Sequence, residues 1–411
     1  MPWRSRVVAA ALGSALVVAV LVAVVDGDRL EPDAASPAAP GPTTTITGPP
    51  APTTTSPPTT APPPRSFTLV ATGDILLHGT LQQQGAADAA AAGAPGFDFR
   101  PLLASLAPAV SAADLAICHL ETPIAPAGGP YAGYPAFSVP PEIAPALAAT
   151  GYDACTTASN HTYDRGAAGV DRTLAALDAA GIGHAGSARS PDEATQVTLL
   201  EAGAGAARVA LLSYTYGFNG VPAPDGQTWR SNPIDERRIL TDAARARAGG
   251  ADVVVVALHW GDEYQHEPNA QQHDLAPRLI RSPDVDLLLG HHAHVVQPLE
   301  QIDGEWVVYG MGNAVANHQT PGAANEEGLL VRFTFTEGPS SGPWRVTDAG
   351  FAPLLVDKDG PPIRLLDVGR ALADPATDPA LRSRLETARD RTTEVVGRRG
   401  ATAAGLQPIG P

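Results

Sequence analysis

Apolar and polar positions between residues 67 and 289 form short apolar runs separated by amphipathic stretches. The apolar runs predict buried strands over 67–72, 115–118, 152–157, 209–213, 253–258 and 285–289. The amphipathic stretches predict helices over 101–113, 141–150, 171–180, 236–248 and 271–281. Strands that alternate with helices in this way indicate an α/β fold.

The pattern changes after residue 289. Three further strands are predicted over 295–302, 306–309 and 329–336, with no helix between them. This indicates a mixed sheet or two packed sheets, and we assign residues 66–365 to one folded domain. Residues 366–411 read as a polar C-terminal tail that contains one helix, near 378–398, and a disordered end.

The first 65 residues carry a different pattern. Arg4 and Arg6 precede 19 residues, 7–25, that are almost entirely Ala, Leu, Val and Gly. That length can cross a bilayer, and the basic flank stays in the cytoplasm. We therefore predict that residues 1–30 form an uncleaved anchor in the cytoplasmic membrane, which makes the chain a single-pass protein of the cell membrane with an extracytoplasmic domain. A cleaved signal peptide, and hence a secreted protein, is the alternative.

Residues 31–65 are rich in Pro, Thr and Ala and read as an extended linker. The chain of 411 residues has a formal net charge of -16, and this charge argues against nucleic acid as a partner. Cys118 and Cys155 lie in two predicted neighbouring strands. A disulfide is allowed outside the cytoplasm, but sequence does not fix the distance, and we expect two buried free thiols.

Polar side chains follow the ends of several predicted strands. They are Asp74, Glu121, Asn160, His259 and His292. In open α/β sheets this edge is where sites are built. His292 and His294 would face one point if their segment is extended, because alternate residues of a strand share a face. Imidazole and carboxylate ligands together suit Zn, Mn or Fe, so the pattern predicts a metal site.

The segments around these residues resemble the CapA family of poly-γ-glutamate capsule proteins, which belongs with the calcineurin-like metallophosphoesterases. The resemblance covers about 67–318. It is carried by Gly73-Asp74, Leu120-Glu121-Thr122-Pro123, Ala158-Ser159-Asn160-His161, His259-Trp260-Gly261, Gly290-His291-His292-Ala293-His294 and Tyr309-Gly310-Met311-Gly312-Asn313.

The resemblance implies a metallophosphoesterase-like four-layer sandwich, in which two mixed β-sheets are flanked by helices. It also implies one or two divalent metal ions, with Mn, Zn and Fe left open. Asp74 and His294 would hold one ion, Glu121 would bridge, and Asn160, His259 and His292 would hold the other. His161, with Asp164, would be catalytic. We further expect substrate to meet His78, His119, Glu263, His291 and Asn313.

Three positions depart from the family pattern. Metallophosphoesterases usually carry Asp-x-His in the first segment, but Leu76 stands two residues after Asp74 and the nearest histidine is His78. Glu121 stands where the superfamily uses Asp, and His119 stands where this family often has Asn. These departures leave open whether one metal or two are bound.

Three functions remain open on the sequence. The first is a metal-dependent hydrolase acting on an anionic envelope polymer, or on a small ester or amide. The second is a non-catalytic protein that tethers or exports such a polymer. The third is an ordinary phosphodiesterase.

Overall fold

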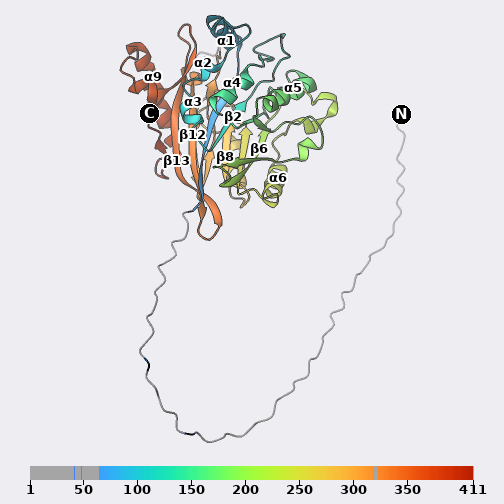
Figure 1. Cartoon of the computed structure of the whole chain (residues 1–411), viewed down its shortest axis with the longest axis vertical. Coiled ribbons are helices and arrows are strands. Elements are labelled where there is room, and N and C mark those ends of the chain that lie inside the picture. The colour runs from blue at the N-terminus through green and yellow to red at the C-terminus, as the bar shows by residue number, and fades with distance from the viewer. Residues whose placement is uncertain (1–40, 42–47, 49–63, 319–322, 411) are drawn as a thin grey trace, which may run out of the picture. The chain divides into compact units, whose positions relative to one another are not determined.

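A computed structural model describes residues 41, 48, 64–318 and 323–410 (Figure 1). The predicted anchor at 1–30 and nearly all of the predicted linker at 31–65 lie outside the described residues. Within the described ranges, no helix combines the length and the apolar character needed to cross a bilayer.

Two mixed β-sheets form the centre of the domain. The larger sheet has nine strands in the described residues. Seven of them lie in the order β14 (Arg364–Asp367), β13 (Gly342–Asp357), β12 (Glu327–Gly338), β1 (Ser66–Ile75), β2 (Leu115–Leu120), β3 (Ala154–Thr156) and β4 (Gly183–Ala185). The other two are β11 (Asn313–Val315), which pairs with β1, and β15 (Gln407–Pro408), which pairs with β13. Strands β1 to β4 run parallel to one another, whereas β1, β12, β13 and β14 are antiparallel neighbours.

The smaller sheet has six strands in the described part of the chain: β5 (Thr198–Ala202), β6 (Ala207–Thr215), β7 (Val253–His259), β8 (Leu287–His291), β10 (Glu305–Val308) and β9 (Leu299–Ile302) in order. The helices are α1 (Gly79–Ala91), α2 (Arg100–Leu103), α3 (Ala107–Val110), α4 (Ile143–Thr150), α5 (Gly166–Ala179), α6 (Glu236–Ala248), α7 (Ala270–Ile280), α8 (Val368–Ala373) and α9 (Pro379–Gly397). Short 3-10 turns lie at η1 (Glu193–Thr195), η2 (Pro224–Gly226), η3 (Thr228–Arg230) and η4 (Ala323–Glu326).

The core is layered because alternate residues of each strand face opposite sides. Leu69 of β1 and Val255 of β7 pack in one cluster between the two sheets. Val70 packs instead with residues of α1 to α5 on the outer face of the larger sheet, and Val254 packs with α6 and α7 on the smaller one. The predicted sandwich of two mixed sheets flanked by helices is confirmed.

The predicted helix over 101–113 is two short helices, α2 and α3. Pro101 and Pro108 occupy the first turns of these helices. Proline lacks an N–H and its ring clashes with the preceding turn, so Pro108 begins a new helix where the apolar pattern continues. Helix α1 and the long strand β13 were not predicted.

The C-terminal segment is part of the fold, which corrects the expectation of a polar tail with a disordered end. The boundary predicted at 365 falls inside β14, and residues 401–410 are described through to β15. Helix α9 buries Leu385, Val395 and Val396, and Leu406 is buried beyond it. A single apolar stripe on a mostly polar helix is enough to attach it to the sheet, and overall composition conceals such a stripe.

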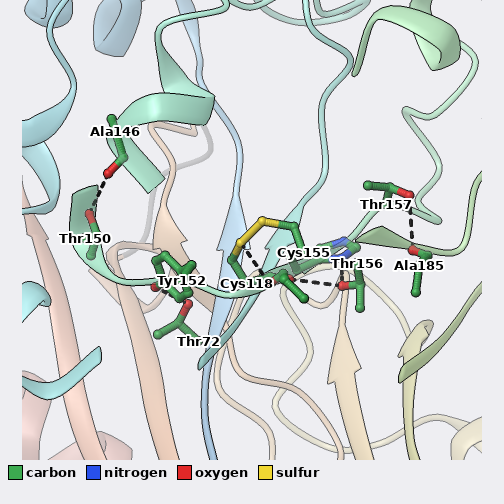
Figure 2. Close-up of a disulfide and its surroundings, with 11 residues drawn as sticks. Thr72, Cys118, Ala146, Thr150, Tyr152, Cys155, Thr156, Thr157 and Ala185 are labelled. Atoms are coloured by element: carbon green, nitrogen blue, oxygen red, sulfur yellow. Dashed lines mark hydrogen bonds between the residues drawn. A yellow bond between two sulfur atoms is a disulfide. The ribbon is translucent and has the colours of Figure 1, made fainter. Parts of the chain in front are cut away.

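Cys118 and Cys155 form a disulfide, so the expectation of two free thiols was wrong (Figure 2). The two cysteines are direct partners in the parallel register of β2 and β3, with Cα atoms 4.4 Å apart. That distance lies at the short end of the range a disulfide spans. The register that creates it comes from strand pairing and is not visible in the sequence.

The disulfide closes a loop with a sequence separation of 37 residues. We expect Cys118→Ala with Cys155→Ala to lower the free energy of unfolding by about 2–4 kcal/mol, because the cross-link restricts the unfolded chain. Urea unfolding of the wild type and the double variant measures this difference. Thiol titration of the unreduced, denatured wild type should find no free thiol, and two reactive thiols would contradict the assignment.

Candidate metal centre

The residues predicted to bind metal converge where strands of both sheets end. Asp74 lies near the end of β1, Glu121 directly follows β2, and His259 ends β7. Asn160 follows β3, and His292 and His294 follow β8. All six are buried, with at most 4% of their surface exposed. The folding of two sheets thus brings residues that are far apart in the chain to one point.

The potential ligand atoms lie close together. Three sets each keep their ligand atoms within 4.8 Å of one another: Asp74 with Glu121 and His294, Asp74 with His119 and His259, and Glu263 with His292 and His294. His259 Nε2 lies 3.0 Å from Asn160 Oδ1 and 3.8 Å from Glu121 Oε1. His294 Nε2 also lies 3.8 Å from Glu121 Oε1.

Glu121 provides the sharpest test of whether these residues fit a metal ion. Both of its carboxylate oxygens are buried without a hydrogen-bond partner in the described part of the chain, and so is Nδ1 of His292. A buried charge without a partner costs several kcal/mol, so such groups normally pair or coordinate metals. Carboxylate, amide oxygen and imidazole together suit Zn, Mn or Fe. The residues present therefore fit a divalent cation.

The surroundings shift the pKa values of the two central carboxylates in opposite directions. Burial works to raise the pKa of Asp74, but hydrogen bonds from His291 and His294 outweigh it and hold that pKa well below its usual range. Burial raises the pKa of Glu121 well above its usual range. A bound cation would reverse this preference, because it stabilises the charged carboxylate.

The histidines of the centre are also perturbed. Burial lowers the pKa of His292 to about 3 and lowers the pKa values of His119 and His259 well below the usual range. His294 is the exception: burial opposes the charged form, yet the charges of Glu121 and Asp74 raise its pKa to about 9. A lowered pKa favours the neutral imidazole, which is the form that coordinates a metal.

The segment after β8 is not extended, which corrects the reasoning that placed His292 and His294 on one face of a strand. Both residues have positive φ, 88° for His292 and 52° for His294. Their rings nevertheless lie 5.9 Å apart, centroid to centroid, and both have a nitrogen near Glu263. Strained backbone of this kind in non-glycine residues concentrates at functional sites.

Three residues predicted to meet substrate are buried behind the predicted ligands. His291 Nδ1 lies 2.8 Å from Asp74 Oδ1, and Asn313 Oδ1 lies 2.9 Å from His294 Nδ1. His119 Nε2 lies 3.0 Å from His259 Nδ1. Partners of this kind orient ligands and fix the protonated nitrogen of a histidine. Their placement favours such a role over contact with substrate.

His161 and Asp164, predicted to be catalytic, form a pair with Nδ1 and Oδ2 2.8 Å apart. The backbone N–H of Phe137 donates to the same Asp164 oxygen. The Phe137 ring contacts both histidines, with its centroid 4.8 Å from that of His161 and 5.2 Å from that of His78. His78 therefore lies beside the centre, and Glu263 is the exposed member of the predicted set.

Two further residues border the centre and were not predicted. The His318 ring lies 4.3 Å from the His294 ring, and the Tyr216 ring lies 4.5 Å from the His292 ring. Tyr216 directly follows β6, so the strand-end signal that selected the other residues would have found it. His318 follows no long strand and had no such signal.

We expect Glu121→Gln to reduce the divalent metal retained by the purified chain, because a neutral amide no longer compensates a cation. Elemental analysis of wild type and variant at equal protein concentration measures the change. Glu305→Gln is a matched control, since Glu305 is also buried with an unpartnered Oε2 but pairs with Arg345 away from the centre. Equal metal in the Glu121 variant and the wild type would contradict the assignment.

Comparison with known proteins links this centre to a family. Residues 68–318 match the family described as "Bacterial capsule synthesis protein PGA_cap". The capsule biosynthesis protein CapA of Bacillus anthracis is 29% identical over 177 residues, which are 42% of this chain and 42% of that protein. The PGA biosynthesis protein CapA of Bacillus subtilis is 31% identical over 159 residues, 39% of this chain and 41% of that protein. The chain thus spans about two fifths of the length of these relatives.

A longer match is found in Mycobacterium tuberculosis, where a "Probable polyglutamine synthesis accessory protein" is 29% identical over 246 residues, 56% of this chain and 64% of that protein. Among solved structures, the calcineurin-like phosphoesterase YfkN of Bacillus subtilis is similar over 81% of this chain and 99% of that chain, with 16% identity and a TM-score of 0.43. A 5'-nucleotidase precursor of Thermus thermophilus is similar over 71% of this chain and 54% of that chain, with 14% identity and a TM-score of 0.43. Likeness at this level says nothing about the reaction.

Proposed function

The chain belongs to the bacterial capsule synthesis family PGA_cap, and from this premise we propose that it is a metal-dependent hydrolase that processes an anionic, poly-γ-glutamate-type polymer of the cell envelope. The observation that carries the proposal is Glu121. Its two oxygens are buried and unpartnered in the described chain, among histidines that offer ligand atoms. A buried carboxylate that only stabilises a fold normally has at least one hydrogen-bond partner.

Two sets of residues would hold the metal. Asp74 and His294 would bind one ion, Asn160, His259 and His292 a second, and Glu121 would lie between them. Divalent ions, when bound, supply Lewis-acid polarisation of the scissile group and lower the pKa of water. With a single ion, Glu121 and His294 would remain its ligands, since their atoms lie 3.8 Å apart.

His161 would protonate the leaving group. Its Nδ1 is held by Asp164 at 2.8 Å, which leaves Nε2 as the atom that exchanges a proton with substrate. The carboxylate fixes the ring orientation and stabilises the imidazolium. Phe137 packs edge-on to the ring and excludes water from one side of it.

The polymer would be recognised through the metal. The chain carries a formal net charge of -16, which repels a polyanion at long range. Bound cations reverse the sign of the local field, so they would be the element that draws a carboxylate or a phosphate into the cleft. An envelope location, with residues 1–30 as an anchor in the cytoplasmic membrane, suits such a substrate.

We expect His161→Asn to lower turnover of γ-glutamyl polymer by about 10²–10⁴-fold, the usual contribution of one acid–base group. The Asn amide still reaches Asp164 in place of Nδ1, so fold and metal content should remain as in the wild type. Initial rates on γ-glutamyl polymer and on a phosphodiester, each with Mn²⁺ and with Zn²⁺, measure the effect and separate the two substrate classes.

His184→Asn serves as the matched control, because His184 pairs with Asp178 at 3.2 Å outside the centre. Its turnover should equal that of the wild type. Unchanged hydrolysis by metal-loaded His161→Asn would remove His161 from the mechanism. No turnover by the wild type on either substrate would instead favour polymer tethering or export.

The proposed extracytoplasmic location of the folded domain can be tested separately. Protease added to intact protoplasts should digest the folded domain, because the basic flank at Arg4 and Arg6 keeps only the first residues inside. Immunoblotting against the C-terminal segment follows the digestion, with a cytoplasmic protein as the control for intact cells. Full protection of the domain would contradict an extracytoplasmic location.

A further inference from the structure

His119 is an unusual partner for a predicted metal ligand. Its Nε2 lies 3.0 Å from His259 Nδ1, and its Nδ1 lies 2.8 Å from the Thr156 hydroxyl. The Thr156 hydroxyl in turn donates to the backbone oxygen of Cys118 at 3.4 Å (Figure 2). Two imidazoles and a hydroxyl thus form one continuous hydrogen-bonded chain that ends at His259.

The other nitrogen of His259 faces the centre. Nε2 lies 3.0 Å from Asn160 Oδ1 and 3.8 Å from Glu121 Oε1. To bind an ion, Nε2 must offer a lone pair, so the proton of the neutral ring must be on Nδ1. That Nδ1–H can then donate only to His119 Nε2, which places the His119 proton on Nδ1, where it donates to Thr156.

The same chain also works in the opposite direction. Without an ion, the amide oxygen of Asn160 can accept a hydrogen bond from His259 only if His259 Nε2 carries the proton. His259 Nδ1 then accepts from His119 Nε2–H, and His119 Nδ1 accepts from the Thr156 hydroxyl. Because a hydroxyl is both donor and acceptor, the hydrogen-bonded chain is satisfied in either direction with the same number of protons, and the change between the two directions takes up one proton and releases another.

We propose that Thr156 and His119 are positioning residues that give Nδ1 of His259 a hydrogen-bond partner in either neutral tautomer, and so hold His259 ready for a divalent ion. A ligating histidine usually donates its second N–H to a carboxylate or a carbonyl. A carboxylate would hold only the metal-bound tautomer, whereas this chain satisfies both tautomers. His259 therefore has a full set of hydrogen bonds with the ion bound and without it.

Because the hydrogen-bonded chain is buried, the loss of any of its hydrogen bonds is unfavourable. His119 and His259 are each 1% exposed, and Thr156 is fully buried, so no water replaces a lost partner. A buried N–H that loses its partner keeps the full penalty of its desolvation. Removing the acceptor at His119 would therefore penalise the metal-bound tautomer of His259.

The positions of His119 and Thr156 in the hydrogen-bonded chain are fixed by the fold. His119 and Thr156 are direct partners in the register of β2 and β3, and the disulfide joins the preceding pair, Cys118 and Cys155. The His119 ring also stacks on the His291 ring at 4.1 Å. These contacts leave the two nitrogens of His119 with little freedom to choose other partners.

The inference rests on the metal centre proposed above, and the test separates the two. The full chain is titrated with Co²⁺, and its visible absorption gives both the affinity and the number of ions bound. We expect His119→Leu to bind Co²⁺ about 10–100-fold more weakly than the wild type with the same number of ions at saturation, as for other partners of metal ligands.

His119→Gln is the conservative variant. If His119 only filled space, the Gln and Leu variants would bind Co²⁺ equally weakly. Its terminal amide reaches the place of Nε2 and can accept from or donate to His259, so its affinity should stay near that of the wild type. Thr156→Val removes the end of the chain at nearly constant volume, and it should weaken binding in the same direction as His119→Leu. This variant also serves if His119→Leu does not fold.

The outcomes are distinct. Wild-type protein that binds no Co²⁺ overturns the metal centre, and with it the positioning role of His119 and Thr156. If the wild type binds Co²⁺ and His119→Leu binds it with unchanged affinity, only the positioning role is overturned. Thr156→Val takes the place of His119→Leu in this comparison if the Leu variant does not fold. One ion fewer at saturation in the Leu variant would make His119 a ligand and also overturn its positioning role. Equal losses in the Gln and Leu variants would mean that only packing of the ring matters.

Discussion

The structure depends on how it accommodates two carboxylates, Asp74 and Glu121, that are fully buried where the two sheets meet. Asp74 is compensated by His291 and His294. The carboxylate of Glu121 has no hydrogen-bond partner in the described chain, and imidazole nitrogens of His259 and His294 lie 3.8 Å from its Oε1. Burying such a group is unfavourable unless a cation lies beside it, so the arrangement is one that a metal ion would complete.

The centre belongs to the packing of the two sheets and to neither sheet alone. His259 comes from β7 of the smaller sheet, yet its ring contacts Asn160 and His119 of the larger sheet. Apolar residues such as Leu69 and Val255 hold the sheets together beneath it. Any change that shifts one sheet against the other therefore shifts the ligand set, and stability and metal binding are coupled.

The missing histidine of the first segment has a structural explanation. Leu76, which stands where metallophosphoesterases usually carry that histidine, is buried in the apolar cluster beneath the helices of the larger sheet. Two other rings lie beside Asp74 instead: His291 bonds its carboxylate, and His119 has a nitrogen within 4.8 Å of it. The departure is local, since imidazoles from elsewhere in the chain surround the same carboxylate.

Much of the fold was readable from the sequence because its signals are local. The boundaries of α6 and the run of β7 follow directly from apolar periodicity, and Asp74, Glu121, Asn160, His259 and His292 were found because polar residues follow strands. Proline placement would have split α2 from α3 by the same local logic. The apolar stripe of α9 was missed because composition was weighed above spacing.

Only the tertiary structure decided which of these residues touch. The Cys118–Cys155 bond depends on the register of β2 against β3, and the His119–His259 contact depends on the distance between two sheets. Strand pairing and sheet packing bring together residues that are 37 and 140 positions apart in the sequence. Local sequence patterns do not specify which residues make contacts over such separations. Sequence by itself determined most of the elements and the chemistry at their ends, whereas long-range packing decided the partners.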